Sequence, residues 1–316
     1  MRVSYLKIFV ISAMFFINSC TAVFSTYNTV EGSIVSLFGS SKIIENKIIN
    51  PYCPNARLAV LWVGHATVLI QIDDRFILTD PIFTETVAFL SKRLFEPGID
   101  IQNLPQIDVT LISHLHPDHL SLGSLEMIEE KISDLIVPEG GLLYIPNYNF
   151  NSNELKWWKS KEINGIKITA VPVLHNGMRY GLDYNWLPRA FTGYVIEYND
   201  ITVYFGGDTG YDSTATIFKE TALKFPNIDL AILPISPIHP REYSYLRHTD
   251  SHDALLIAEE LKAKKIMPIH FDTFAEAYDT LGEAESLMKV EMQKKNLSDR
   301  EVFILKIGKQ KTIIKK

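Results

Sequence analysis

Histidine and aspartate directly follow four separate apolar, β-branched stretches of this chain of 316 residues. The first stretch, residues 107–113, leads into the hexapeptide HLHPDH at 114–119, which holds three of the nine histidines. Three further stretches of this kind lead into His175, Asp208 and His270. Side chains that follow neighbouring strands come together where the strand ends meet at one edge of a sheet. The sequence therefore predicts buried strands whose ends gather these imidazoles and carboxylates at one rim.

The predicted cluster holds five imidazoles and two carboxylates, namely His114, His116, Asp118, His119, His175, Asp208 and His270. Ligands of these types suit zinc and, less selectively, iron or manganese. Seven ligands are too many for one tetrahedral ion and suit two ions that share a carboxylate. No cysteine is among them, which excludes a cysteine-rich structural site. Coordination positions left to water indicate hydrolysis.

The rest of the pattern places strands in hairpin groups, interrupted by single helices. Hairpins are expected around Asn164-Gly165 and Asn199-Asp200. Helices are expected over 124–132, 214–225, 251–263 and 280–295, with Ser251 as the N-cap of the third. Other strands are expected over 58–63, 67–72, 75–80, 134–139, 228–235, 264–269 and 301–307. This alternation predicts α/β layers, with two sheets inside and helices outside.

Composition excludes several classes of function. The chain is 47% hydrophobic and 22% charged, which suffices for a buried core and excludes disorder. The formal net charge is −6 and no long basic run occurs, so nucleic acid is not an expected partner. The glycine turn at 206–210 lacks the dinucleotide-binding fingerprint, and the chain has no Walker sequence.

The N-terminus has the features of an export signal. Arg2 and Lys7 precede an apolar stretch over 8–17, which is too short to span a bilayer and typical of the core of a signal peptide. Residues 17–20 then read INSC, and this sequence, which ends at Cys20, resembles a bacterial lipobox. We expect a lipoprotein anchored through Cys20 to a membrane of the bacterial cell envelope, on its periplasmic or extracellular face. An ordinary secretion signal and an uncleaved anchor are the alternatives.

Three segments follow from this pattern. Residues 1–20 are expected to be the signal peptide, 21–57 a tether and lead-in, and 58–314 the hydrolase domain. The one other cysteine is Cys53, so we expect no internal disulfide in the mature chain.

The hexapeptide matches the HxHxDH signature of the metallo-β-lactamase fold, and the three later ligands follow in the order expected for that fold. Four more segments resemble the branch that contains N-acylphosphatidylethanolamine-hydrolysing phospholipase D: WVGHATV at 62–68, LTDPIF at 78–83, GDTGY at 207–211 and IHFDTF at 269–274. The resemblance runs from about residue 58 to residue 308. It implies a four-layer αββα sandwich.

The resemblance divides the ligands between two zinc ions that Asp208 bridges. The first ion would be held by His114, His116 and His175, and the second by Asp118, His119 and His270. A hydroxide between the metals would attack the phosphorus of a phosphodiester. If the substrate carries over as well, the products would be a phosphatidic acid and an N-acylethanolamine.

The expected catalytic residues are Asp118 and His248. The family has a histidine near the metals at the position of His248, where it would donate a hydrogen bond to phosphate or a proton to a leaving group. The alternative for His248 is a loop histidine in solvent. His65 and Asp80 are expected to orient ligands, with a core histidine and a turn aspartate as the alternatives. Arg179 is a candidate for phosphate contact, although surface arginines are common.

The resemblance weakens where the substrate would bind. The segment 234–242, the residues after His175 and those after His270 depart from the phospholipase pattern, which leaves the headgroup and chain preference open. One alternative is a hydrolase of lactones or of other small esters and phosphodiesters. Another is a lipoprotein without activity that binds metal for stability, which loss of a ligand would favour; none of the seven is missing. The resemblance also allows a homodimer.

Overall fold

The computed structural model describes residues 36–37, 39–87, 91–180, 183, 186–214, 216–275 and 279–316. The predicted signal peptide, including Cys20, and the first part of the predicted tether lie outside these residues. Within the described ranges, no helix has both the length and the apolar character needed to cross a membrane.

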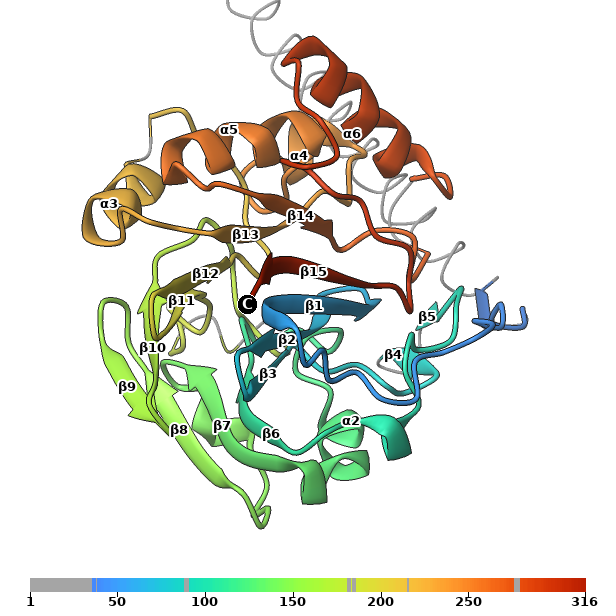
Figure 1. The fold of residues 1–316 in the computed structure, drawn as a ribbon, viewed down its shortest axis with the longest axis vertical. Coiled ribbons are helices and arrows are strands. Elements are labelled where there is room, and N and C mark those ends of the chain that lie inside the picture. Colours follow the sequence, from blue (N-terminus) through green and yellow to red (C-terminus); the bar gives the residue numbers. More distant parts are fainter. Residues whose placement is uncertain are drawn as a thin grey trace, which may run out of the picture.

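Two mixed β-sheets form the centre of the fold (Figure 1). The larger sheet contains, in spatial order, β15 (Gln310–Lys315), β1 (Ala56–Gly64), β2 (Thr67–Ile72), β3 (Arg75–Thr79), β6 (Ile107–Leu111), β7 (Ile132–Pro138) and β8 (Asn151–Leu155). The smaller contains β14 (Ile266–Ile269), β13 (Leu230–Pro234), β12 (Ile201–Phe205), β11 (Gly193–Tyr198), β10 (Ile166–Val171) and β9 (Ser160–Ile163). A ribbon of β4 (Thr86–Val87) and β5 (Ser91–Lys92) stands apart.

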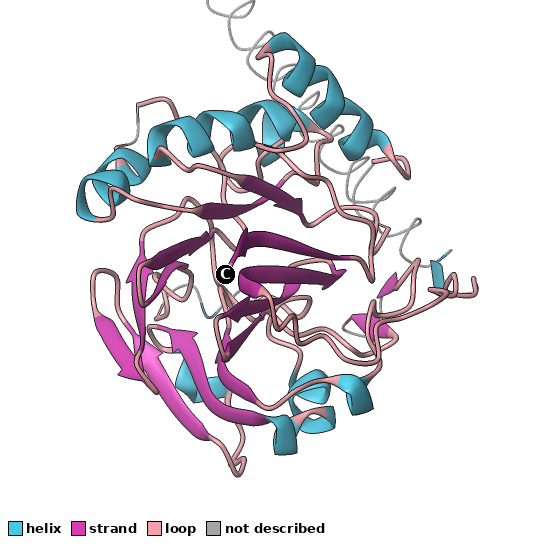
Figure 2. Cartoon of the chain, in the orientation of Figure 1, coloured by secondary structure: helices cyan, strands magenta, loops and turns pink. Residues whose placement is uncertain are grey.

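Helices cover the outer faces of the two sheets (Figures 1 and 2). Beside the smaller sheet lie α3 (Ile217–Lys224), α4 (Arg241–Ser244), α5 (Ser251–Leu261) and α6 (Glu283–Lys294). On the opposite side lies α2 (Leu122–Met127), and short 3₁₀ turns occur at η1 (Ile101–Asn103), η2 (Glu129–Lys131) and η3 (Gly141–Tyr144). The predicted α/β architecture, with two sheets inside and helices outside, is confirmed.

Strand β1 shows why the sequences of the central strands are continuously apolar. Successive side chains of a strand point to opposite faces of the sheet. Val60 and Trp62 lie in one buried cluster, which includes residues of both sheets, while Leu61 and Val63 lie in a second cluster with α2. Because both faces of the strand are covered, both sets of side chains are apolar.

Several predicted boundaries differ from the structure. The domain was expected over 58–314, but β1 begins at Ala56, which pairs with Lys315 of β15. The predicted helix over 124–132 is instead α2, capped by Ser121, followed by η2. The side chain of Ser121 accepts a hydrogen bond from the amide of Ser124, which satisfies a free donor in the first turn.

The predicted N-cap of α5 was wrong by one residue. Asp250 caps the helix, because its Oδ1 accepts the amide hydrogen of Asp253 at 2.9 Å. The hydroxyl of Ser251 donates instead to the carbonyl of Ala284 on α6, at 3.2 Å. Aspartate and serine cap helices about equally well, so only the packing of α5 against α6 decides between them.

One predicted strand is absent, and one observed strand was not predicted; both cases lie at the edges of the sheets. The apolar segment 301–307 was expected to be the closing strand, but only Val302 makes a bridge there, to Ile266. Its side chains are largely buried in the core, and the closing strand is the less apolar β15, which pairs with β1. Strand β8 was not predicted because its sequence, NSNEL, is polar; it lies at the exposed edge of its sheet.

Candidate metal centre

The four ligand-bearing segments meet where the two sheets face each other. Residues 114–119 follow β6, His175 follows β10, Asp208 follows β12 and His270 follows β14. The strands come from both sheets, and a bridge between His114 and Phe191 connects them beside the site. The structure thus brings all seven predicted ligands together.

The first predicted set has three imidazoles whose nitrogens face one another. Nδ1 of His116 lies 2.8 Å from Nε2 of His114 and 3.4 Å from Nε2 of His175. The outer nitrogens have other contacts: Nδ1 of His175 donates to the carbonyl of Arg247 at 2.8 Å, and Nδ1 of His114 lies 3.0 Å from the hydroxyl of Ser113. Such outer contacts fix the ring so that the inner nitrogen presents its lone pair.

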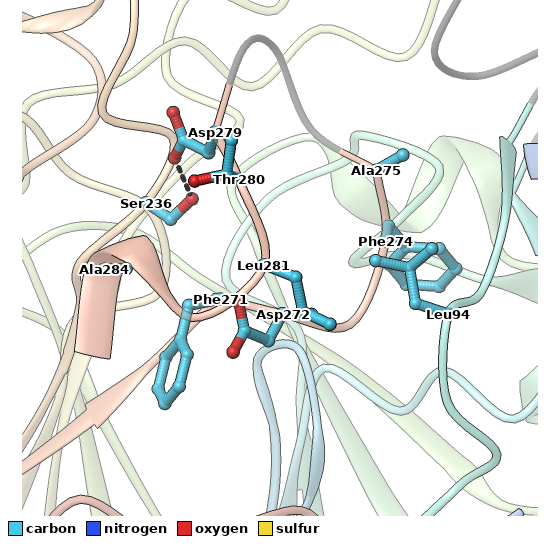
Figure 3. A pocket seen from close by; sticks show the side chains of 10 residues that line it. All are labelled: Leu94, Ser236, Phe271, Asp272, Phe274, Ala275, Asp279, Thr280, Leu281 and Ala284. Carbon is cyan, nitrogen blue, oxygen red and sulfur yellow. Dashed lines mark hydrogen bonds between the residues drawn. The ribbon is translucent and has the colours of Figure 1, made fainter. Parts of the chain in front are cut away.

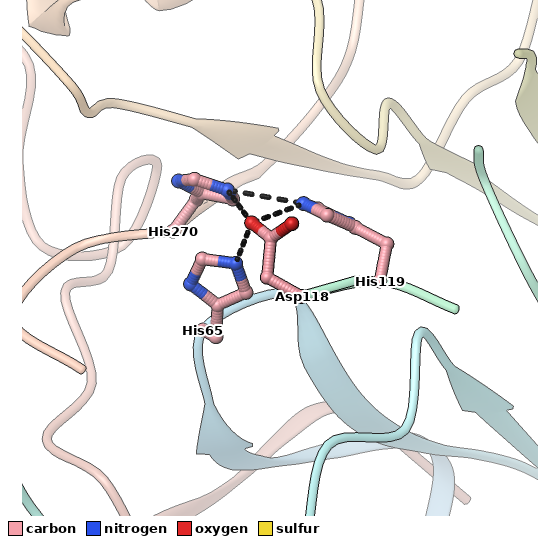
Figure 4. A group of neighbouring side chains, drawn as sticks. All are labelled: His65, Asp118, His119 and His270. Carbon is pink, nitrogen blue, oxygen red and sulfur yellow. Dashed lines mark hydrogen bonds and ion pairs between the residues drawn. The ribbon is translucent and has the colours of Figure 1, made fainter. Parts of the chain in front are cut away.

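The second predicted set is centred on Nε2 of His119 (Figure 4). This nitrogen lies 3.2 Å from Nε2 of His270 and 3.4 Å from Oδ2 of Asp118. Nδ1 of His119 lies 2.7 Å from the buried carboxylate of Asp80. His65, which was expected only to orient a ligand, points into the same group, and its Nε2 lies 3.0 Å from Oδ2 of Asp118.

Asp208 lies between the two sets. Its Oδ1 is 3.0 Å from Nε2 of His270, and its Oδ2 is 3.5 Å from Nε2 of His119 and 4.0 Å from Nε2 of His175. Oδ2 is also 3.4 Å from Nδ1 of His248, which is mostly buried beside the two sets. One carboxylate therefore reaches both sets, as a bridging ligand must.

Burial decides the charge of the first set. It lowers the pKa of His114 well below its usual value, and the neighbouring histidines lower it further. The pKa of His175 is lowered well below its usual value by burial, against the opposing effect of Asp208. Both imidazoles are therefore neutral near pH 7, which is the form that binds a metal ion.

Three carboxylates give the second set the opposite character. Burial opposes a charge on His119, but Asp208, Asp118 and Asp80 together raise its pKa well above the usual value. Burial also opposes the ionisation of Asp118 and Asp208, yet the charges of neighbouring histidines lower the pKa of each carboxyl group well below its usual value. The carboxylates of this group therefore stabilise positive charge. A bound divalent ion would supply that positive charge, so that the imidazoles could stay neutral and coordinate the ion.

These residues fit two cation sites. Among the described residues, donor atoms lie within 4.8 Å of one another in four groups. Two of them correspond to the predicted sets, namely His114–His116–His175 and His65–Asp118–His119–His270, and the other two contain Asp208, namely His114–His119–Asp208 and His175–Asp208–His248. Imidazole and carboxylate donors at this spacing suit zinc or another transition metal. The assignment of individual ligands remains a prediction.

A comparison with protein families decides the relationship. The model of the β-lactamase superfamily domain matches residues 75–271, more than half of the chain and including all seven predicted ligands. The chain belongs to the β-lactamase superfamily. A UPF0173 metal-dependent hydrolase of Exiguobacterium sp. is 30% identical over 220 residues, which cover 68% of this chain and 86% of the relative. This superfamily member is thus a metal-dependent hydrolase.

Two relatives of the superfamily hydrolase carry a more specific name. An N-acyl-phosphatidylethanolamine-hydrolyzing phospholipase D of Caenorhabditis elegans is 28% identical over 247 residues, covering 73% of this chain and 68% of the relative. The mitochondrial enzyme of that name from Saccharomyces cerevisiae is 31% identical over 224 residues, covering 67% of this chain. The aligned part spans only 47% of the yeast protein.

Solved structures agree on the fold. An isothiocyanate hydrolase from Delia radicum gut bacteria superposes with a TM-score of 0.60 at 16% identity, covering 80% of this chain and 98% of that one. Igni18, a metallo hydrolase from Ignicoccus hospitalis, superposes with a TM-score of 0.58 at 18% identity, covering 80% and 97%. At this identity, the likeness shows that the superfamily fold is shared.

The backbone of this superfamily hydrolase is unusual at the site. Asp80, His65 and His270 have positive φ angles of 33°, 52° and 62°, a region that non-glycine residues seldom adopt. At Gly207, beside Asp208, φ is 57° and an added Cβ would lie 2.3 Å from Cβ of Ser113. Such strain persists only where the surrounding structure enforces it, and it is common at functional sites.

Two supporting residues differ from expectation. Ser113 was not singled out, although it directly precedes the hexapeptide; its amide and its hydroxyl donate to Asp80 at 2.7 and 2.6 Å. Arg179, a candidate for phosphate contact, instead donates from Nη1 to the carbonyl of Leu115, within the hexapeptide, and to that of Leu120, directly after it. Both residues therefore hold the ligand loop in place.

A separate pocket adjoins the loop that follows His270 (Figure 3). Its lining includes Phe271, Asp272 and Asp279, and none of the seven predicted ligands. The carboxylate of Asp279 accepts hydrogen bonds from the hydroxyl of Ser236 and the amide of Ile238, at 2.6 and 2.7 Å. Asp279 therefore supports the 234–242 segment rather than the metal centre.

Proposed function

We propose that this hydrolase binds two zinc ions and cleaves phosphodiesters of the phospholipase D type, with N-acylphosphatidylethanolamine-like lipids as substrates. The observation that carries the proposal is the position of Asp208 between two sets of ligands. The names of the worm and yeast relatives support the lipid substrate.

Each part of the site has a task in this reaction. Two bound divalent ions would supply the activation of water and the charge stabilisation at phosphorus. The sets His114–His116–His175 and Asp118–His119–His270 would hold them, with Asp208 shared. The oxygen of water forms a bond to phosphorus and gives up one proton, while the bond from phosphorus to the ethanolamine oxygen breaks. That oxygen must then gain a proton.

His248 is the candidate for this last proton transfer. Its backbone is fixed, because its amide donates to the carbonyl of Ser244 at 2.8 Å and its carbonyl accepts from Arg241 at 2.7 Å. Its side chain keeps about a fifth of its surface exposed, so it borders both the buried cluster and the solvent side. A histidine in this position can donate a proton to a leaving oxygen.

Exposed apolar side chains, some of them on segments that contact the ligand-bearing loops, support a lipid substrate. We call Leu143, Tyr180, Trp186, Tyr245 and Leu246 the apolar rim; each exposes more than two fifths of its surface.

The apolar rim is tied to the site by its neighbours. Tyr144, adjacent to Leu143, packs against Tyr180 with ring centroids 5.7 Å apart. On the other side, Arg247 follows Leu246 and its carbonyl accepts the hydrogen bond from His175. A lipid aggregate contacting the rim would place its headgroups near the ligands. Anchoring of Cys20 in the bacterial envelope is part of this proposal and would keep the enzyme beside such a membrane.

The first experiment uses the full chain, purified in detergent and loaded with zinc. It is mixed with N-acylphosphatidylethanolamine in micelles, products are followed by mass spectrometry, and Asp118→Asn serves as the blank. Release of N-acylethanolamine by the parent alone is the expected result. If the parent binds two zinc ions but releases no N-acylethanolamine, the proposed lipid substrate is wrong, and lactones and small phosphodiesters become the substrates to test. A parent that binds no metal would overturn the proposal entirely.

A further inference from the structure

His65 occupies the tight turn between β1 and β2 and contacts Asp118 and His270, two predicted ligands from separate segments of the chain. It is fully buried, and its φ of 52° lies in the left-handed region. Its Nε2 lies 3.0 Å from Oδ2 of Asp118, and its ring lies 3.8 Å from the ring of His270, centroid to centroid (Figure 4). One side chain therefore contacts both a carboxylate and an imidazole of the second set.

The main chain of His65 makes the same connection. Its carbonyl accepts the amide hydrogen of His270 at 3.1 Å and the indole hydrogen of Trp62 at 3.0 Å. Its amide donates to the hydroxyl of Thr273 at 2.6 Å. The turn of the larger sheet is thus joined to the loop that carries His270 from the smaller sheet.

The chemistry of the Asp118 contact defines what His65 does. An ionised carboxylate only accepts hydrogen bonds, so Nε2 of His65 carries the hydrogen. That nitrogen then has no lone pair for a cation. The carboxylate oxygen still has a second lone pair, which can point toward Nε2 of His119, 3.4 Å away. His65 fixes the direction of that lone pair without being a ligand through Nε2.

We propose that His65 is a positioning residue of the second cation site, which sets the affinity of the second ion and leaves the first ion unaffected. The inference rests on the proposed two-metal function. The side-chain contacts described above are to the second set, and the hydrogen bond from Nε2 restrains the carboxylate of Asp118 from one side. Loss of such an outer contact typically weakens metal affinity by about 10- to 100-fold.

The test compares two amide side chains at this position. The amide nitrogen of glutamine can occupy the place of Nε2 of histidine, whereas that of asparagine reaches only the place of Nδ1. His65→Gln keeps the donor to Asp118 and His65→Asn loses it, while both remain polar and asparagine tolerates the left-handed backbone. His252→Asn, at an exposed histidine of α5 paired with Glu291, is the matched control.

The measurement is zinc binding by the full chain in detergent, after removal of metal, against a competing chelator, with zinc counted by mass spectrometry. For His65→Asn we expect the second ion to bind about 10- to 100-fold more weakly, with the first ion unchanged. His65→Gln should bind the second ion within a few-fold of the parent, and His252→Asn should match the parent. Cobalt in place of zinc gives a second readout, because the absorption that grows with the second equivalent should diminish in His65→Asn alone.

Three outcomes overturn the inference. Equal weakening of both ions in His65→Asn would indicate a general structural role, and unchanged binding would exclude any role. Equal loss in His65→Gln and His65→Asn would show that the ring, and not the hydrogen bond, matters. A parent that binds fewer than two ions would overturn the proposed two-metal function as well, which separates the two failures.

Discussion

Asp80 and His119 form a fully buried pair, in which Oδ2 of the carboxylate lies 2.7 Å from Nδ1 of the imidazole. Because the carboxylate accepts, Nδ1 carries a hydrogen, and in the neutral form that binds a metal ion the lone pair of Nε2 faces the other ligands of the second set. Asp80 in turn accepts from the amide and the hydroxyl of Ser113. Asp80, which is not itself a predicted ligand, thus orients the central ligand of the second set.

This pair leads to a prediction about metal affinity. Replacing Asp80 with asparagine removes the charge that orients His119, so zinc should bind the second site about 10- to 100-fold more weakly. Competition with a chelator measures the change. Asp108→Asn is the matched control, because Asp108 is a partly buried carboxylate that holds Arg75 and the amide of Phe76 instead. Equal loss of zinc in the two variants would contradict an orienting role for Asp80.

Replacing His248 with alanine distinguishes a proton donor from a metal ligand. If it protonates the leaving oxygen, His248→Ala should keep two zinc ions while kcat falls by about 100- to 10,000-fold. Substrates with more acidic leaving alcohols should recover much of the rate, because they need no proton. Zinc content and kcat are measured on the same preparation. Loss of one zinc ion from His248→Ala would instead make it a ligand.

The apolar rim should matter only when the substrate is a lipid aggregate. Leu143→Ser removes an apolar side chain that would enter the membrane, worth about 1.5–3 kcal/mol when fully buried, so the rate on vesicles should fall by about 10-fold. The rate on a dispersed short-chain phosphodiester should not change. Leu223→Ser is the matched control, since Leu223 is an even more exposed leucine that lies on α3. Equal rates for both variants on vesicles would contradict a role of the apolar rim in binding the lipid aggregate.

Asp183 predicts a dependence of stability on pH. Burial opposes its ionisation, but hydrogen bonds from the amides of Arg179 and Tyr180 and from the hydroxyl of Tyr144 lower its pKa below the usual value. A carboxyl whose folded pKa is depressed stabilises the fold above its unfolded pKa of about 4 and loses this contribution as pH falls through the folded pKa. The stabilisation should therefore be present at neutral pH and disappear in acid.

The variant Asp183→Asn tests whether the stabilisation is present at neutral pH and lost in acid. We expect the variant to lose about 1–3 kcal/mol of unfolding free energy at neutral pH, from urea denaturation of the metal-free chain. The difference between parent and variant should shrink as pH falls below about 4, where the parent carboxyl takes up its proton. A difference that stays constant across this range would mean that the charge of Asp183 contributes nothing.

The strands around the site could be predicted because their signals are local. The apolar runs that end at His114, His175, Asp208 and His270 are visible without any partner, and turn residues mark both hairpins. Prediction from sequence failed where two local structures were about equally favourable. Asp250 and Ser251 are both good caps, and the polar strand β8 resembles a loop until it pairs with β7.

The sequence by itself therefore determined which residue types stand at the strand ends, the superfamily, and the hydrolytic character of the site. Only the tertiary structure decided how those ends are joined. His65 and His270 are far apart in the chain and follow strands of different sheets, yet they share a backbone hydrogen bond and a ring contact. No local pattern encodes such a contact, because it depends on how two sheets pack and on which backbone positions accept a positive φ.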